Sequence, residues 1–205
     1  MRGNIEIEKR RLLLVEGDDD QGVFLKLIKA FGIEDVQVIS LGGKDHLNVG
    51  LLESIKKASG FRNIVSLGIV RDADENQGNV FNALCGVLEK CGLAVPERPM
   101  EFFGENPKVG VLILPPDREK GALEDLCLAS LEGRVEMDCI EEYFRCLQDR
   151  LSPEKFPKNL AKAKIQAFLA SQRESVPKLG IAAQRGYIPF EHEVFSKIKD
   201  FIRDL

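Results

Sequence analysis

The sequence has few of the residues from which structural metal sites are usually built. Its 205 residues include two histidines and five cysteines, and no two cysteines form a Cys-x-x-Cys pair. Structural zinc sites depend on clustered thiols and imidazoles, so we expect none here. An odd number of dispersed thiols is also typical of a reducing compartment, and we expect a cytoplasmic protein.

Long apolar runs are absent as well. No stretch approaches the roughly 20 apolar residues that cross a bilayer, and the N-terminal segment is charged where a signal peptide would be apolar. We therefore expect no contact with membranes. The 29 lysines and arginines against 33 acidic residues give a formal net charge of −4. Such a chain does not attract nucleic acid as a whole, so any such contact needs a local basic patch or a bound metal ion.

Short apolar runs alternate with amphipathic segments over the first 114 residues. Continuous apolar runs between such segments are typical of a parallel sheet covered on both faces. Segment 96–108 has three prolines and one glycine and is predicted to be irregular. The pattern predicts strands at 11–16, 36–41, 64–70 and 109–114, and helices at about 20–31, 44–59 and 76–91.

Beyond residue 114 the strand signal ceases. Helices are predicted at about 121–131, 136–150 and 158–171, and a short one from about 191. The fold class is therefore α/β, Rossmann-like, with a mostly parallel four-stranded sheet flanked by helices. We predict a domain over residues 1–131 and a helical C-terminal extension over 132–205 that packs on the same core.

Acidic residues stand where two of the predicted strands end. Glu16 follows the first apolar run, and Asp72 and Asp74 follow the third. Ligands of open parallel sheets bind outside the carboxyl ends of the strands. Converging carboxylates raise each other's pKa or recruit a cation, and carboxylate oxygens suit Mg²⁺ or Mn²⁺. The sequence therefore predicts a divalent metal site at this edge.

Helix capping is the competing explanation for several of these acids. Asp18, Asp19 and Asp20 stand at the start of a predicted helix, where carboxylates cap free N–H groups, and for the first two we favour this explanation. Glu16 ends a strand where no cap is needed. Asp72 and Asp74 are two residues apart, so in an extended backbone both carboxylates point the same way.

Three blocks of the sequence follow one another on the predicted strand ends and helix starts. They are Val15-Glu16-Gly17 with Asp20, then Asp72-Ala73-Asp74, then Leu112-Ile113-Leu114-Pro115-Pro116 with Gly121-Ala122-Leu123-Glu124-Asp125-Leu126. Together they resemble the Toprim domain of topoisomerases, DnaG-type primases and OLD-family nucleases. The likeness covers roughly residues 11–131, looks closest to small Toprim-like proteins of the DUF3226 type, and implies a Toprim-like fold.

This resemblance implies roles for the acids. Asp72 would bridge two ions, and Glu16 and Asp74 would complete the first site, with Asp20 as a further ligand. Glu124 would contribute to a second site with support from Asp125, although two acids in a first helical turn are also explained by the helix dipole. Glu16 could instead act as general acid or base. Paired ions activate a water and stabilise a leaving oxygen.

A phosphodiester-cleaving site also needs positive charge. Lys44 follows two glycines at the end of the second predicted strand, on the same sheet edge as the acids, and is the predicted catalytic cation. Segment 155–178 holds six lysines and arginines against one glutamate. Lys162 and Lys164 of this segment are the predicted nucleic-acid contacts, and a solvated helix face is the plain alternative.

The leading functional hypothesis is a Mg²⁺- or Mn²⁺-dependent Toprim-like nuclease or phosphodiester-transfer protein that acts on nucleic acid. The alternative is a non-catalytic module that binds metal and nucleic acid or protein. A receiver-type phosphoacceptor needs no second acid like Asp74, and a haloacid-dehalogenase-type phosphatase would have its Asp-x-Asp on the first strand. OLD proteins usually carry an ATPase domain, but the chain has no Gly-x-x-x-x-Gly-Lys-Ser/Thr loop, so ATP dependence would require a partner.

Overall fold

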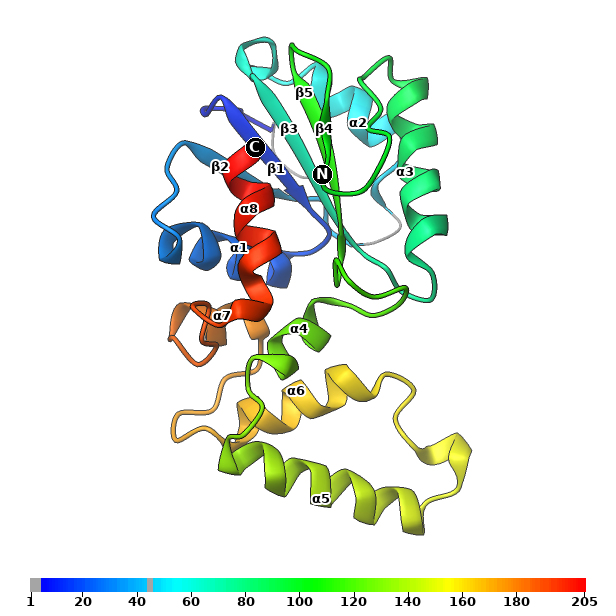
Figure 1. The fold of residues 1–205 in the computed structure, drawn as a ribbon, viewed down its shortest axis with the longest axis vertical. Coiled ribbons are helices and arrows are strands. Elements are labelled where there is room, and N and C mark those ends of the chain that lie inside the picture. Colours follow the sequence, from blue (N-terminus) through cyan, green and yellow to red (C-terminus); the bar gives the residue numbers. More distant parts are fainter. Residues whose placement is uncertain (1–4, 44–45) are drawn as a thin grey trace.

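The computed structural model describes residues 5–43 and 46–205, and its centre is a five-stranded sheet (Figure 1). The strand order is β2-β1-β3-β5-β4, with β4 antiparallel to β5 and the other pairs parallel. The α/β class is confirmed. The strands are β1 (Arg11–Val15), β2 (Val36–Ser40), β3 (Ser66–Asp72), β4 (Phe102–Phe103) and β5 (Lys108–Leu114).

Strand β4 is the one strand that the sequence pattern did not predict, which makes the sheet five-stranded rather than four-stranded. Its two residues are too few to show a periodicity. Phe102 stacks on Phe201 near the C-terminus, with ring centroids 4.9 Å apart. A Cβ on Gly110, which pairs with Phe102, would lie 2.6 Å from the Phe102 ring. The strand is therefore held by contacts between distant parts of the chain.

Helices cover both faces of the sheet. Helices α1 and α8 lie over one face, and α2 and α3 lie over the other (Figure 1). Helix α2 is shorter than predicted because Asn48 caps it, its side chain accepting a hydrogen bond from the Leu51 N–H. Helix α7 was not predicted. The helices are α1 (Asp18–Ala30), α2 (Val49–Lys56), α3 (Gln77–Lys90), α4 (Leu123–Ala129), α5 (Val135–Arg150), α6 (Leu160–Ser171), α7 (Leu179–Gln184) and α8 (Ser196–Asp204).

The core consists of two clusters of buried apolar side chains, one on each face of the sheet. The cluster on the α1 face joins Leu13 and Val70 of the sheet to Phe168 of α6 and Phe201 of α8. A Cβ on Gly68 would lie 3.2 Å from the Phe201 ring, so the absence of a side chain there lets α8 approach the sheet closely. Both predicted parts of the chain thus contribute to one core, and the boundary at residue 131 stays a prediction.

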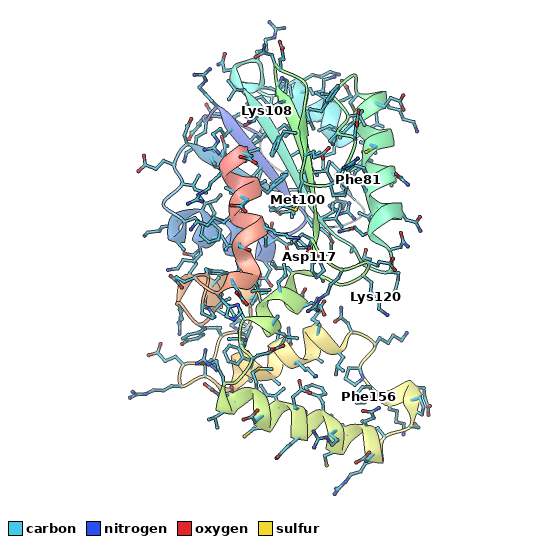
Figure 2. The ribbon with its side chains drawn as sticks, viewed as in Figure 1. Phe81, Met100, Lys108, Asp117, Lys120 and Phe156 are labelled. Carbon is cyan, nitrogen blue, oxygen red and sulfur yellow. The ribbon has the colours of Figure 1, made fainter. Side chains whose placement is uncertain are left out.

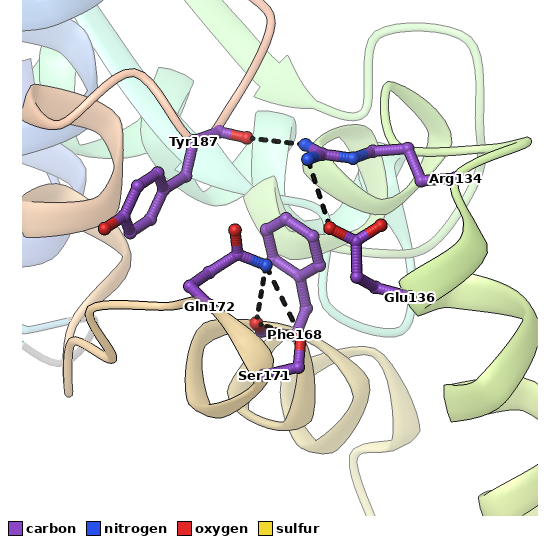
Figure 3. A network of polar contacts seen from close by, with 6 residues as sticks. All are labelled: Arg134, Glu136, Phe168, Ser171, Gln172 and Tyr187. Carbon is purple, nitrogen blue, oxygen red and sulfur yellow. Dashed lines mark hydrogen bonds and ion pairs between the residues drawn. The ribbon is translucent and has the colours of Figure 1, made fainter.

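Helices α5 and α6 lie side by side beyond α4, away from the sheet (Figure 1). Figure 2 shows Phe156 at the far end of this α5–α6 hairpin. At its near end, Arg134 donates to the backbone oxygen of Tyr187 at 3.3 Å and to Glu136 at 3.3 Å, and its guanidinium lies over the Phe168 ring (Figure 3). Arg134 thereby fixes the hairpin to the segment before α8.

In the parts of the chain that the structure describes, no helix combines the length and the apolar character needed to cross a membrane.

Candidate active site

A cavity of about 190 Å³ lies among the carboxyl ends of β1 and β3, the first turns of α1 and α4, and helix α6. One side of it is acidic and the other is formed by α6. Larger hollows exist elsewhere on the molecule, but none of those described has more than two carboxylates in its lining. We call this cavity the acid pocket. Its acidic lining residues are Glu16, Asp19, Asp20, Asp72 and Glu124, and its lining residues from α6 are Lys162, Ile165, Gln166 and Leu169.

The turn after β1 brings two of the acids together. Glu16 directly follows the strand, and Asp20 lies in the first turn of α1, where its Oδ2 accepts a hydrogen bond from the Gly17 N–H at 2.8 Å. A Cβ on Gly17 would lie 3.1 Å from that same oxygen. The glycine therefore leaves room for Asp20 to fold back toward the end of the strand.

Asp72 connects β3 to α4. It is the last residue of the strand, and its Oδ1 accepts a hydrogen bond from the Leu123 N–H at 3.0 Å. Leu123 opens α4, so this bond uses one of the free N–H groups at the helix start. Glu124 is the next residue and lines the same pocket. The bond thus holds the two acids at one edge although they are 52 residues apart.

Burial and mutual repulsion change the ionisation of the buried acids. Burial raises the pKa of Asp72 to about 8, with further contributions from Asp20, Glu16 and Glu124. Burial likewise raises the pKa of Asp20 to about 6, and Glu16 and Glu124 act in the same direction. Below them the fully buried Cys127 has a raised thiol pKa, mainly through burial. Ionisation of these carboxyl groups is therefore costly in the protein alone, and a cation bound among them would lower that cost.

Two cations lie near these acids, one paired with Glu16 and one in the lining of the pocket. The Nε of Arg71 lies 2.9 Å from Glu16 Oε2, and the side chain of Arg71 is 12% exposed. Lys162 lines the pocket from α6 and is exposed. Lys164, by contrast, forms an ion pair with Glu141 of α5 at 2.5 Å. Of the two lysines predicted to contact nucleic acid, the structure therefore brings only Lys162 to the acids.

Two other predicted residues, Asp74 and Asp125, do not line the pocket. Asp74 is exposed and follows the end of β3 with a φ of 49°, so the extended backbone that would align it with Asp72 does not continue. Its backbone pairs with Gly121. Asp125 caps α4, its Oδ2 accepting from the Ala122 N–H at 2.9 Å. Lys44 lies outside the described residues. Four of the six predicted metal ligands thus line one pocket, and their role as ligands stays a prediction.

Comparison with known proteins places the chain in a family. The model of the family described as "Protein of unknown function (DUF3226)" matches residues 10–205. The chain belongs to the DUF3226 family. This DUF3226 chain has no match among curated proteins.

Solved structures show the same fold. The C-terminal region of the Burkholderia pseudomallei OLD protein is 17% identical, with a TM-score of 0.54, over 97% of this DUF3226 chain and 98% of that chain. The C-terminal region of the Xanthomonas campestris pv. campestris OLD protein is 16% identical, with a TM-score of 0.50, over 96% and 95%. The predicted resemblance to the OLD type is confirmed for the fold, and it extends through the C-terminal helices, beyond residues 11–131.

The donor chemistry of the pocket in this DUF3226 protein fits a hard divalent cation. Carboxylate oxygens are the preferred ligands of Mg²⁺, which often uses only one or two of them and keeps several waters. Within the described residues, no three histidine, cysteine, aspartate or glutamate side chains stand close enough to form a ready-made metal site. A cation held here would therefore have one or two direct protein ligands, or its arrival would draw the acids together.

Sequence reasoning missed two polar contributors to the pocket. Asp19, interpreted as a helix cap or a solvated residue, lines the pocket, and its Oδ1 accepts a hydrogen bond from the Gly180 N–H of α7 at 3.1 Å. Gln166 lines it from α6. The acid run before α1 was a signal for Asp19. Nothing in the helical periodicity of α6 indicates which distant strand ends it faces.

Proposed function

We propose that this DUF3226 protein is a Mg²⁺- or Mn²⁺-dependent phosphodiesterase that cleaves nucleic acid at the acid pocket. The observation that supports it is the convergence of Glu16, Asp20, Asp72 and Glu124 in one cavity, opposite Lys162. Burial, and the neighbouring carboxylates to a smaller extent, raise the pKa values of Asp20 and Asp72, and a divalent cation would favour the ionised form of both groups. The shared fold with OLD C-terminal regions is consistent with this proposal.

Each group has a role that follows from its position. Glu16 and Asp72, at adjacent strand ends, would hold the cation, and Asp20 and Glu124 would support it from the two helices. A bound cation would supply positive charge to the phosphate and lower the pKa of a coordinated water. Lys162 stands on the opposite side of the pocket, where it would bind a phosphate oxygen and stabilise the charge that develops on it.

The apolar part of the lining would strengthen the interactions between charged groups in the pocket. Ile165 and Leu169 of α6 and Leu123 of α4 border the acids, and all three side chains are buried. Apolar walls keep the dielectric constant low, so the charges of acids, lysine and phosphate act on one another more strongly than in water. Glu16, held by Arg71 from one side, is also the residue best placed to exchange a proton with an attacking water.

A non-catalytic binding module is the second candidate. The observation that favours it is that no three acidic, histidine or cysteine side chains of the described residues form a closed metal site. Such a module would bind a cation and a phosphate group without turnover. The two candidates differ in cleavage alone, which makes a cleavage assay the deciding experiment.

The test uses purified protein with supercoiled plasmid, linear DNA and single-stranded RNA, in Mg²⁺ or Mn²⁺ and in EDTA. Glu16→Gln and Asp72→Asn remove one carboxylate charge each, and Glu132→Gln, at an exposed position after α4, is the matched control. We expect cleavage that needs the metal, is lost in the first two variants and persists in the control.

Metal binding is followed separately by calorimetry with Mn²⁺. Binding that depends on Glu16 and Asp72, without cleavage of any substrate, would replace the enzyme with the binding module. No binding and no cleavage would reject both candidates.

A further inference from the structure

A second hollow adjoins the acid pocket along α6. Its volume is about 290 Å³, and it shares Gln166 and Leu169 with the acid pocket. The rest of its lining comes from Ala170 of α6 and from residues 175–177, the segment between α6 and α7. The two cavities are therefore neighbouring compartments with a common border.

The α6 residues that mark this path lie on one face of the helix. Lys162, Gln166 and Ala170 follow one another at intervals of four residues, which places them in a row. At a rise of 1.5 Å per residue, each step along the row is about 6 Å. Lys162 stands at the acid pocket, Gln166 at the shared border and Ala170 in the second hollow.

The second hollow differs from the acid pocket in its chemistry. None of the residues that line it is charged. Leu169, Ala170, Val176 and Pro177 give it aliphatic walls, and its polar groups are the amide of Gln166 and the hydroxyl of Ser175. Such a lining suits an uncharged, largely apolar group with hydrogen-bonding atoms at its edge.

We propose that this hollow is a nucleobase subsite, which binds the base of a nucleotide whose phosphate occupies the acid pocket. The proposal rests on the proposed function, because it takes the acid pocket as the place of the phosphate. The aliphatic side chains would make van der Waals contact with the base, and the Gln166 amide at the border would donate to or accept from its edge. A single amide distinguishes poorly between the four bases, so we expect the subsite to bind different bases.

The subsite selects single-stranded nucleic acid. A base in a duplex is stacked and paired, so its removal from the helix costs free energy. This cost is smaller for a base in a single strand, which has no pairing partner. Segment 175–177 contributes to the lining together with α6, and the hollow is open to solvent. An unpaired base enters such a compartment without separation from a partner strand.

The experiment compares two fluorescein-labelled oligonucleotides of equal length by anisotropy, a thymidine oligomer and an abasic oligomer with the same phosphates. Ca²⁺ replaces Mg²⁺ so that binding is measured rather than turnover. We expect the abasic oligomer to bind about tenfold more weakly, because it loses the apolar contacts and the hydrogen bond of the base. A thymidine oligomer paired to its complement should also bind more weakly than the free strand.

The variant that tests the location is Ala170→Leu, which fills the hollow from an exposed helix position, and Ala83→Leu on the exposed face of α3 is the matched control. Ala170→Leu should lower the affinity for the thymidine oligomer to that for the abasic one, with the latter unchanged and the control without effect.

Equal affinity of the unaltered protein for thymidine and abasic oligomers would overturn the base subsite while nucleic-acid binding stands. Tighter binding of the duplex, or an Ala170→Leu protein that still discriminates, would overturn it too. Binding of neither oligomer would reject nucleic acid as the substrate, and with it both proposals.

Discussion

Arg71 Nε donates a hydrogen bond to Glu16 Oε2 at 2.9 Å, and both side chains are largely buried. The strand register explains this pair. Leu14 of β1 pairs with Ile69 of β3, and Glu16 and Arg71 each lie two residues beyond these paired residues. A buried ion pair is costly to break on one side only, since the remaining charge is left without compensation. Arg71 therefore competes with any cation that binds Glu16.

We expect Arg71→Gln to have two opposite effects. Loss of the guanidinium should lower the free energy of unfolding of the metal-free protein by about 2 kcal/mol, because Glu16 loses its charged donor. Mn²⁺ should bind more tightly, by about threefold to tenfold, because a competing positive charge is gone. Urea unfolding in EDTA and calorimetry with Mn²⁺ measure the two, with Arg62→Gln at an exposed position as control. Weaker Mn²⁺ binding would show that Arg71 orients Glu16 for the metal instead.

Asp72 should make the metal-free protein less stable as pH rises. Its pKa is raised from 3.8 to about 8, so the native state binds this proton more tightly than the unfolded chain does. The resulting stabilisation is complete below about pH 4 and is lost progressively up to about pH 8. The charged groups near Asp72 in the pocket are Glu16, which follows β1, Asp20 of α1, Glu124 of α4 and Lys162 of α6.

Asp72→Asn should remove most of this pH dependence. The asparagine oxygen still accepts from the Leu123 N–H, but no proton is taken up. In EDTA at pH 8 the variant should have a higher free energy of unfolding than the unaltered protein, by at least about 1 kcal/mol. A pKa shift of a single unit would already account for about that difference. At pH 4 the two should agree. A difference that is the same at both pH values would contradict the assignment.

Packing of α1 against α7 depends on two glycines. A Cβ on Gly22 would lie 2.8 Å from the Gly180 Cα, a distance that requires backbone movement. Gly22→Ala should therefore lower the free energy of unfolding by about 1–3 kcal/mol. Gly86 of α3 has no atom within 4 Å of the Cβ position, so Gly86→Ala should raise it by about 0.5–1 kcal/mol through helix propensity alone. Urea unfolding of both variants measures the contrast, and equal effects would mean that the α1–α7 contact is looser.

The sequence was informative where structure is local. Strands β1 and β3 were predicted from their apolar runs, because a strand that is buried on both faces of a parallel sheet is apolar throughout. Glu16 and Asp72 were expected to converge because the carboxyl ends of neighbouring parallel strands meet at one edge. Both line the acid pocket.

The sequence was uninformative where the structure depends on contacts between distant segments. Phe102 belongs to a strand because it pairs with β5 and stacks on Phe201, and neither partner is visible in a two-residue pattern. Asp74 was aligned with Asp72 on the assumption of extended backbone, which its φ of 49° does not meet. The position of α6 over the acids depends on its packing with α4 and α5, which helical periodicity leaves open.

Two neighbouring lysines of α6 separate a role at the acid pocket from a role in stability. Lys162 lines the pocket, and Lys164 pairs with Glu141 on the adjacent helix. Lys162→Met should lower kcat/KM for nucleic-acid cleavage by about 10²–10³-fold, the loss typical for removal of one group that stabilises a transition-state charge. Lys164→Met should leave cleavage within about twofold and change the free energy of unfolding by no more than about 1 kcal/mol, because one partner of its ion pair is exposed.

Steady-state cleavage and urea unfolding of both proteins provide the comparison, and Lys162→Arg should retain part of the activity because it keeps the charge. Similar losses of cleavage in both methionine variants would mean that the α5–α6 hairpin acts through general positive charge. Full activity in Lys162→Met would remove this lysine from the chemistry and leave the acids at the ends of β1 and β3 and in α1 and α4 as the charged groups of the site.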